Sequence, residues 1–281
     1  MNANAPGVRW QIWAFVALVR KGWRIDRRQP FFTFSSAVAL AQFVLPTALA
    51  TIALAGPNGE ALERFTRLTG TDAYLAYAVI GSTTFVWTGF LYVDLSNNLS
   101  MDRSVGTLPT LWSSATSRVV LVCGGSIGRA LAPTLMASGA FGIAWAVFRF
   151  PMKPHIGPAA IVLLCGGLAT IAAAVPWAAA VLRYRESRLL VAVFASASGV
   201  LAGTAYPVHL LPGWAQWLSG FLPTTWMIRG LRDALIFDDI QDAVLAGGVL
   251  LAMALAYGVA GLVLLHVMDA SARAKGELEW M

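Results

Sequence analysis

Six long stretches without a charged residue dominate this sequence. They cover residues 29–59, 73–93, 130–148, 154–182, 189–228 and 243–268. A helix that crosses about 30 Å of hydrocarbon needs about 20 apolar residues, so these stretches predict an all-α membrane protein that crosses the bilayer several times. We expect six transmembrane helices, near residues 32–55, 74–94, 128–148, 158–182, 189–206 and 243–266.

The composition excludes the other broad classes. Hydrophobic residues make up 58% of the 281 residues and charged residues only 12%, whereas soluble domains carry about 25% charged residues. Intrinsic disorder is excluded as well, because it requires low hydrophobicity. Cys123 and Cys165 lie in apolar stretches with no CxxC motif or histidine cluster nearby, so we expect them to pack in the membrane and predict no metal site.

The basic residues predict the orientation of the chain. With six spans, thirteen Lys and Arg residues fall on the side of the two termini and six on the other side. Because cytoplasmic loops carry the excess of Lys and Arg, we expect both termini in the cytoplasm and the protein in the plasma membrane. Arg129 belongs to neither count. Two positions of Arg129 stay open: residues 119–128 form an interfacial segment from which Arg129 snorkels to the headgroups, or the third span begins at Val119 and places Arg129 about 15 Å deep.

The N-terminal segment, residues 8–28, predicts an amphipathic helix in the membrane interface. Basic residues interrupt the apolar run of this segment, which therefore does not match the pattern of a cleavable signal peptide. On a helical wheel one face is apolar and a neighbouring face is basic, with Ile12, Val16, Val19 and Trp23 on the first and Arg9, Arg20, Arg24 and Arg27 on the second; Lys21 adds to the charge. Two roles stay open: an anchor that sets topology, or a connecting helix that contacts a cytoplasmic partner.

The stretch 189–228 is too long for one helix, and prolines divide its second half. We expect two short helices in 207–235 that dip into the outer face of the membrane and return. Apolar residues from Trp214 follow a helical stripe, Pro212 suits its first turn, and Pro223 ends it, so that Thr224 or Thr225 can cap the next helix. The alternative is a seventh, kinked span.

The loop after the second span predicts a short cytoplasmic helix over 101–115. Thr107 is a suitable N-cap, and Pro109 fits the first turn. Leu108, Leu111 and Trp112 would form one apolar face. Such a helix suits docking to another protein, and the alternative is an ordinary interfacial loop.

Two series of residues resemble the ABC-2 type permeases, the membrane subunits of ABC exporters. The first lies in the cytoplasmic loop: Asp102-Arg103, Gly106-Thr107-Leu108, Leu111 and Thr116-Ser117-Arg118. At the position of Asp102 the family usually has glutamate. At the position of Pro109 it often has glutamate as well. The second lies between the last two spans: Tyr206-Pro207, Leu211-Pro212-Gly213-Trp214, Leu222-Pro223-Thr224-Thr225 and Arg229-Gly230-Leu231-Arg232.

The resemblance implies one transmembrane domain over 1–281 and a role in export rather than catalysis. It implies a coupling helix at 101–115 that fits an ATPase, a second ATPase contact through the N-terminal helix, and an outer gate that includes Pro207, Pro212, Trp214, Pro223, Arg229 and Arg232. It also implies two copies of an ATP-binding subunit and a second permease, identical or related. This chain lacks a Gly-x-x-x-x-Gly-Lys-Ser/Thr loop, so ATP and magnesium would bind the partner.

Apolar spans suggest an amphiphilic cargo, such as a drug, a lipid or a lipid-linked glycan. They also suggest membrane lipids, and not nucleic acid, as the surroundings of the chain.

Two other classes of membrane protein are alternatives. An intramembrane serine protease would use Ser198 in Ser196-Ala197-Ser198-Gly199, but no histidine is expected within proton-transfer distance. An ion-coupled carrier needs carboxylates near the middle of the membrane, and the predicted spans have none there.

Overall fold

The computed structural model describes residues 7–28, 42–53, 60–104, 106, 110, 114, 116–153, 155–183 and 187–274. Within these residues the fold is helical, without a strand. The helices are α1 (Val8–Arg28), α3 (Glu60–Thr69), α4 (Tyr74–Ser104), α6 (Arg118–Phe148), α7 (Ile156–Arg183), α8 (Ser187–Leu201), α9 (Gly213–Gly220), α10 (Pro223–Arg232) and α11 (Ile240–Ala274). A short 3₁₀ turn, η1, covers Val208–Leu210, a turn of π-helix, η2, covers Asp233–Phe237, and a further apolar helix covers Gln42–Ala53.

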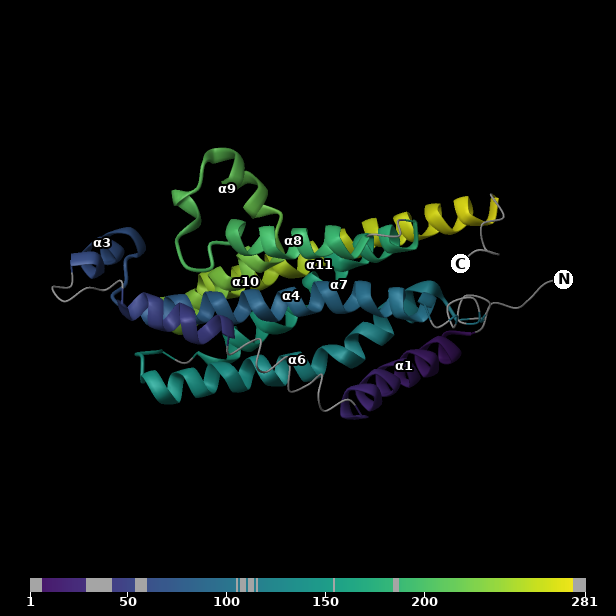
Figure 1. Ribbon diagram of the computed structural model, residues 1–281, viewed down its shortest axis with the longest axis horizontal. Helices are drawn as coiled ribbons and strands as arrows, with labels where there is room; N and C mark the ends of the chain where they lie inside the picture. Colours follow the sequence, from purple (N-terminus) through teal and green to yellow (C-terminus); the bar gives the residue numbers. More distant parts are fainter. Residues whose placement is uncertain are drawn as a thin grey trace.

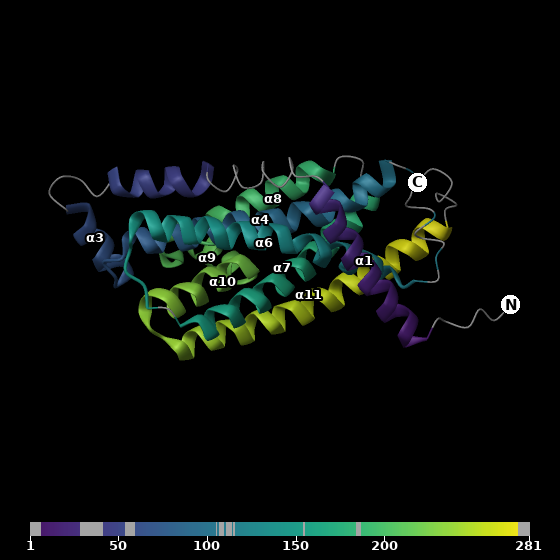
Figure 2. The same cartoon turned by 90° about the horizontal axis from the view of Figure 1, so that it is seen from below.

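The long helices run side by side along one axis (Figures 1 and 2). Four stretches within the described residues are long and apolar enough to cross a membrane: Tyr74–Val93, Gly124–Phe148, Ile156–Pro176 and Ile240–Leu264. They coincide with four of the six predicted spans. The described parts of the other two, Gln42–Ala53 and Val191–Leu201, are apolar helices of less than spanning length.

Helix α4 forms the centre of the bundle. The buried share of its spanning stretch is 78%, whereas the buried share of the spanning stretch in α6 is 11%. Its buried side chains, such as Ile80, Trp87 and Leu91, join a core with residues of α6, α7, α10 and α11. A second cluster packs Val44 and Ala48 of the helix Gln42–Ala53 against the start of α4. The outward faces of the outer helices are apolar, as expected where lipid replaces water.

Two boundaries differ from the sequence-based expectations. Helix α4 continues to Ser104, so residues 101–104 form its last turn and do not begin a separate helix. Helix α6 begins at Arg118, with Ser117 as its N-cap, so residues 119–128 are the first turns of a continuous helix that includes Arg129, and not a separate interfacial segment. Pro133 and Pro176 lie inside α6 and α7 without ending them.

The two ends of the bundle carry different elements. Helix α1, the end of α4 and the end of α11 lie at one end, at the right of Figures 1 and 2. Helices α3 and α9 lie towards the opposite end. The fold therefore separates the segments that were predicted for the two sides of the membrane.

Candidate coupling and gating elements

The segment after α8 folds into two short helices, as the prolines predicted. Helix α9 is eight residues long and α10 is ten. The caps differ from expectation: Pro212 is the N-cap of α9, Leu222 is the N-cap of α10, and Pro223 takes the first turn of α10 in place of a threonine cap. Proline is suited to a first helical turn because its missing N–H has no helical partner there.

Three side-chain hydrogen bonds hold the corner between α9 and α10. The Trp226 indole donates to the Gly220 carbonyl at 2.9 Å. The hydroxyls of Ser219 and Thr225 are 3.1 Å apart. From α11, the Tyr257 hydroxyl donates to the Phe221 carbonyl at 2.5 Å. The bonds from Trp226 and Tyr257 satisfy carbonyls that the end of α9 leaves without helical partners.

Helices α9 and α10 differ in burial. On α9 only Ala215 and Ser219 are buried, and Trp214 is 68% exposed. On α10 seven of ten residues are buried. The predicted gate residues follow this division: Pro212 and Trp214 are exposed, Pro207 is half-buried and Pro223 is buried.

Arg232, at the end of α10, is a buried cation with 5% of its surface exposed. Its Nη1 donates to the Gly203 carbonyl at 3.0 Å, and its Nη2 donates to the carbonyls of Tyr77 at 3.0 Å and Thr204 at 2.6 Å. Its guanidinium also lies 3.3 Å from the centre of the Tyr77 ring. A buried charge needs such partners, because it has lost its hydration.

Arg229, one turn earlier, is an exposed cation. Its Nε lies 3.8 Å from an oxygen of Asp233, and its Nη2 lies 3.6 Å from an oxygen of Asp242. Burial raises the pKa of Asp233 to about 6, and Arg229 opposes that rise. The two arginines of the predicted gate therefore lie in different environments, since Arg232 is inside the fold and Arg229 is at its surface.

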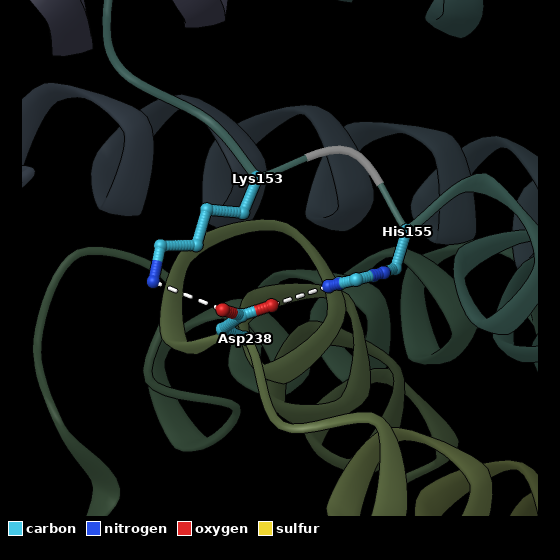
Figure 3. Close-up of polar contacts among 3 residues, drawn as sticks. All are labelled: Lys153, His155 and Asp238. Atoms are coloured by element: carbon cyan, nitrogen blue, oxygen red, sulfur yellow. Dashed lines mark hydrogen bonds and ion pairs between the residues drawn. The ribbon is translucent and has the colours of Figure 1, made fainter.

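Figure 3 shows a second polar contact between segments distant in sequence. Asp238, in the turn before α11, receives a hydrogen bond from Lys153 at 3.0 Å and contacts the His155 ring with its other oxygen. The hydrogen bond from His155, followed by that from Lys153, lowers the pKa of the Asp238 carboxyl. The backbone of Lys153 also donates to the Leu235 carbonyl at 2.9 Å. Together these contacts join the α6–α7 connection to the α10–α11 connection.

Helix α1 lies across the bundle and packs on the first turns of α6. Glycines allow the close approach: a Cβ added at Gly128 would lie 2.4 Å from the Val19 carbonyl oxygen, and one at Gly22 would lie 3.0 Å from the Gly128 backbone. At Gly124 an added Cβ would lie 3.1 Å from Leu18. Small residues four apart are a common device for close helix contact in membranes.

The exposed side of α1 is apolar near its start, at Trp10, Ile12 and Trp13, and basic further along. Arg20, Lys21 and Arg24 are exposed, and Trp23 is half-buried. At the start of α6, the Gln11 side chain accepts a hydrogen bond from the Ser117 backbone at 3.0 Å. The predicted interfacial helix therefore has one face fixed to α6 and its cations free to meet a partner or the membrane surface.

The predicted coupling loop lies mostly outside the described residues. Asp102 and Arg103 lie on the last turn of α4, whereas Thr107, Leu108 and Leu111 lie outside the described part of the chain. Gly106 is described and has a φ of 73°, a backbone conformation that glycine adopts at little cost. Gly106 therefore has a left-handed backbone conformation two residues after the end of α4.

Several of these contacts had no visible sequence signal. Gly81, Asp238 and Lys153 were not singled out, because their partners lie far away in the chain. The Gly124-x-x-x-Gly128 spacing was a usable signal for close helix packing.

Ser198, the serine of the protease alternative, is buried and donates to the Ala195 carbonyl at 2.7 Å. Its hydroxyl is therefore engaged with its own helix. Within the described residues no group of three or more His, Cys, Asp or Glu side chains could hold a metal ion.

These elements define an all-helical membrane protein with helix α1 at one end and short buried and exposed helices towards the other. The sequence model of one family, described as ABC-2 family transporter protein, matches residues 31–263. The match spans most of the chain, so the chain belongs to the ABC-2 transporter family, whose members are membrane components of ABC transporters. Among curated proteins, none matches the chain.

Proposed function

We propose that this chain is the permease subunit of an ATP-driven exporter that moves an amphiphile across the plasma membrane. The observation that carries the proposal is the family match over residues 31–263, which includes the four spanning stretches. ATP and magnesium would bind to a separate ATP-binding subunit, present in two copies. A second permease, identical or related, would complete the transport path.

The ATPase would contact the end of the bundle that carries α1 and the end of α4. Residues 101–115, with Asp102, Arg103 and the Gly106–Leu111 segment, would form the main contact. The basic face of α1 would form the second. Because α1 packs on α6 through glycine contacts, a push on α1 would reach α6 directly. Both termini would then lie in the cytoplasm, as the excess of basic residues favours.

The opposite end would form the outer gate. Helices α9 and α10 are too short to span the bilayer and are joined by a hydrogen-bonded corner. The exposed aromatic side chains Trp214 and Trp217 suit the boundary between acyl chains and headgroups. An amphiphilic cargo fits this arrangement, since the spans offer an apolar path with few charges.

The decisive experiment is affinity purification of the tagged chain from its native host in mild detergent. An ATP-binding protein should co-purify, and the complex should hydrolyse ATP in nanodiscs in a vanadate-sensitive way. The complex, reconstituted in vesicles, should move a fluorescent phospholipid only with ATP. Nucleotide-independent movement by the isolated chain would overturn the proposal.

A further inference from the structure

Arg232 links three elements that are far apart in sequence. We infer that Arg232 is a positioning residue that fastens α10 and the turn after α8 to α4, so that these segments move as one rigid unit during transport. The inference deepens the proposed function and rests on it. The inference divides the predicted gate into two parts. Arg232 belongs to the rigid unit, and the opening movement takes place outside that unit.

The acceptors of Arg232 explain why the link is strong. Gly203 and Thr204 lie two and three residues beyond the last residue of α8, in a turn close to the negative end of the helix dipole. Gly203 has a φ of 68°, which turns the chain so that both carbonyls meet the guanidinium. The third acceptor, the Tyr77 carbonyl, belongs to the first turn of α4. One planar fork of donors therefore satisfies carbonyls of two separate elements.

Gly81 makes this contact possible. A Cβ at Gly81 would lie 1.8 Å from the Thr204 carbonyl oxygen and 2.7 Å from Arg232 Nη2. The first of these is a backbone atom, so it cannot turn aside. The pair Gly81 and Arg232 thus forms a lock in which one residue supplies the space and the other supplies the donors.

A second contact lies further along the same two helices. The Thr224 hydroxyl of α10 donates to the Thr88 hydroxyl of α4 at 3.3 Å, and both residues are fully buried. The other sides of α10 are packed as closely: Met227 lies against Gly166 of α7, and Gly230 lies against Ala246 of α11. Helix α10 is therefore held on the sides that face α4, α7 and α11.

The exposed contacts at the same end have a different character. Arg229 is 55% exposed, and Lys153 is 61% exposed. Ion pairs in such positions contribute little, because water competes for both partners. They can break and form again while the buried link of Arg232 stays intact. At the surface of this end, the rigid unit is therefore joined to its neighbours by contacts that break easily.

The test is a disulfide between α4 and α10. In a chain with Cys123 and Cys165 replaced by alanine, Thr88→Cys and Thr224→Cys place two sulfurs where hydroxyls are 3.3 Å apart, close to disulfide reach. The yield of oxidation by copper-phenanthroline should be the same, within twofold, in nucleotide-free and vanadate-trapped complexes. The cross-linked complex should keep its ATP hydrolysis within twofold. A tenfold loss on oxidation that a reductant reverses would overturn the inference.

Three variants separate the lock from general damage. Gly81→Ala should weaken it, whereas Gly89→Ala on the same helix has no atom within 4 Å of its added Cβ and is the matched control. Arg232→Lys keeps the charge but loses the planar fork of donors. It should fold and hydrolyse ATP, yet lower the cross-linking yield in the vanadate-trapped complex by about threefold or more. An unchanged yield in both Gly81→Ala and Arg232→Lys would refute the positioning role.

Failure of the proposed function gives a different result. If no ATP-binding protein co-purifies, the exporter assignment fails, and cross-linking of the chain alone still reports on the lock. The two single-cysteine variants cannot form the disulfide, so they give the background signal. A low yield in the double-cysteine chain, close to this background, would overturn the link between α4 and α10. A high yield that falls in Gly81→Ala but not in Gly89→Ala would support it.

Discussion

Replacing Gly128 with alanine is expected to push α1 away from α6. The added Cβ would lie 2.4 Å from the Val19 carbonyl oxygen and 2.8 Å from Val19 Cα. Neither backbone atom can turn aside, and ordinary contact needs about 3.5 Å, so α1 would have to retreat by about 1 Å. Overpacking of this kind costs about 1–3 kcal/mol. The better helix propensity of alanine returns up to about 1 kcal/mol, so we expect a net loss of about 1–2 kcal/mol.

Two assays measure this loss. A change of 1 kcal/mol shifts the Tm of a chain of this size by about 2–4 °C, so the Tm in detergent should fall by about 2–8 °C. Release of α1 should also speed cleavage by trypsin at Arg20, Lys21 and Arg24, which are exposed on this helix.

Gly125→Ala is the matched control on the same turns of α6. Its added Cβ meets no atom within 4 Å, so the substitution should leave the Tm unchanged or raise it slightly. Equal effects of Gly125→Ala and Gly128→Ala on Tm and cleavage would refute the close packing of α1 on α6.

Three further predictions concern the two ends of the bundle. Gly106→Pro cannot adopt the observed φ of 73°, and Leu108→Asp puts a charge on the proposed ATPase contact. Each substitution should abolish transport while ATP hydrolysis continues. Normal transport in both variants would remove the coupling role of residues 101–115. Gly213→Cys, at an exposed position, should react with an impermeant maleimide added outside intact cells, whereas labelling from the cytoplasmic side alone would contradict the outer gate. The lowered pKa of Asp238 means that its ionised form stabilises the fold above the ordinary Asp pKa of about 3.9, and that this contribution is lost as pH falls through the lower folded value. Asp238→Asn should therefore flatten the acid limb of a plot of Tm against pH, and an unchanged limb would argue against the contact with His155.

The sequence predicted the elements whose signals are local. Charge-free stretches located α4, α6, α7 and α11, because apolar length and helix length are linked by the thickness of the bilayer. The prolines at 212 and 223 indicated two short helices, which are α9 and α10 in the structure, because proline is favoured in the first helical turn. Boundaries were less certain: α4 runs to Ser104 and α6 begins at Arg118, since the polar residues around both ends are compatible with helix as well as loop.

The candidate sites were only partly visible. Arg229 and Arg232 looked equivalent in sequence, one helical turn apart. Their environments differ because Arg232 meets the carbonyls of Tyr77 and Gly203, whereas Arg229 faces Asp242 at the surface. Glycine has a low helix propensity, but in the structure Gly22 is one of the residues that let α1 approach α6.

The sequence by itself determined that this chain is a helical membrane protein, which segments are apolar, and that two short helices follow α8. These properties depend on hydrophobicity, charge and proline geometry within a few turns. Only the tertiary structure decided which glycines permit contact and which arginine is locked inside the fold. Those outcomes depend on distances between helices, such as Gly81 to Thr204 and Gly128 to Val19, and a close contact between backbones exists only once the whole bundle has assembled.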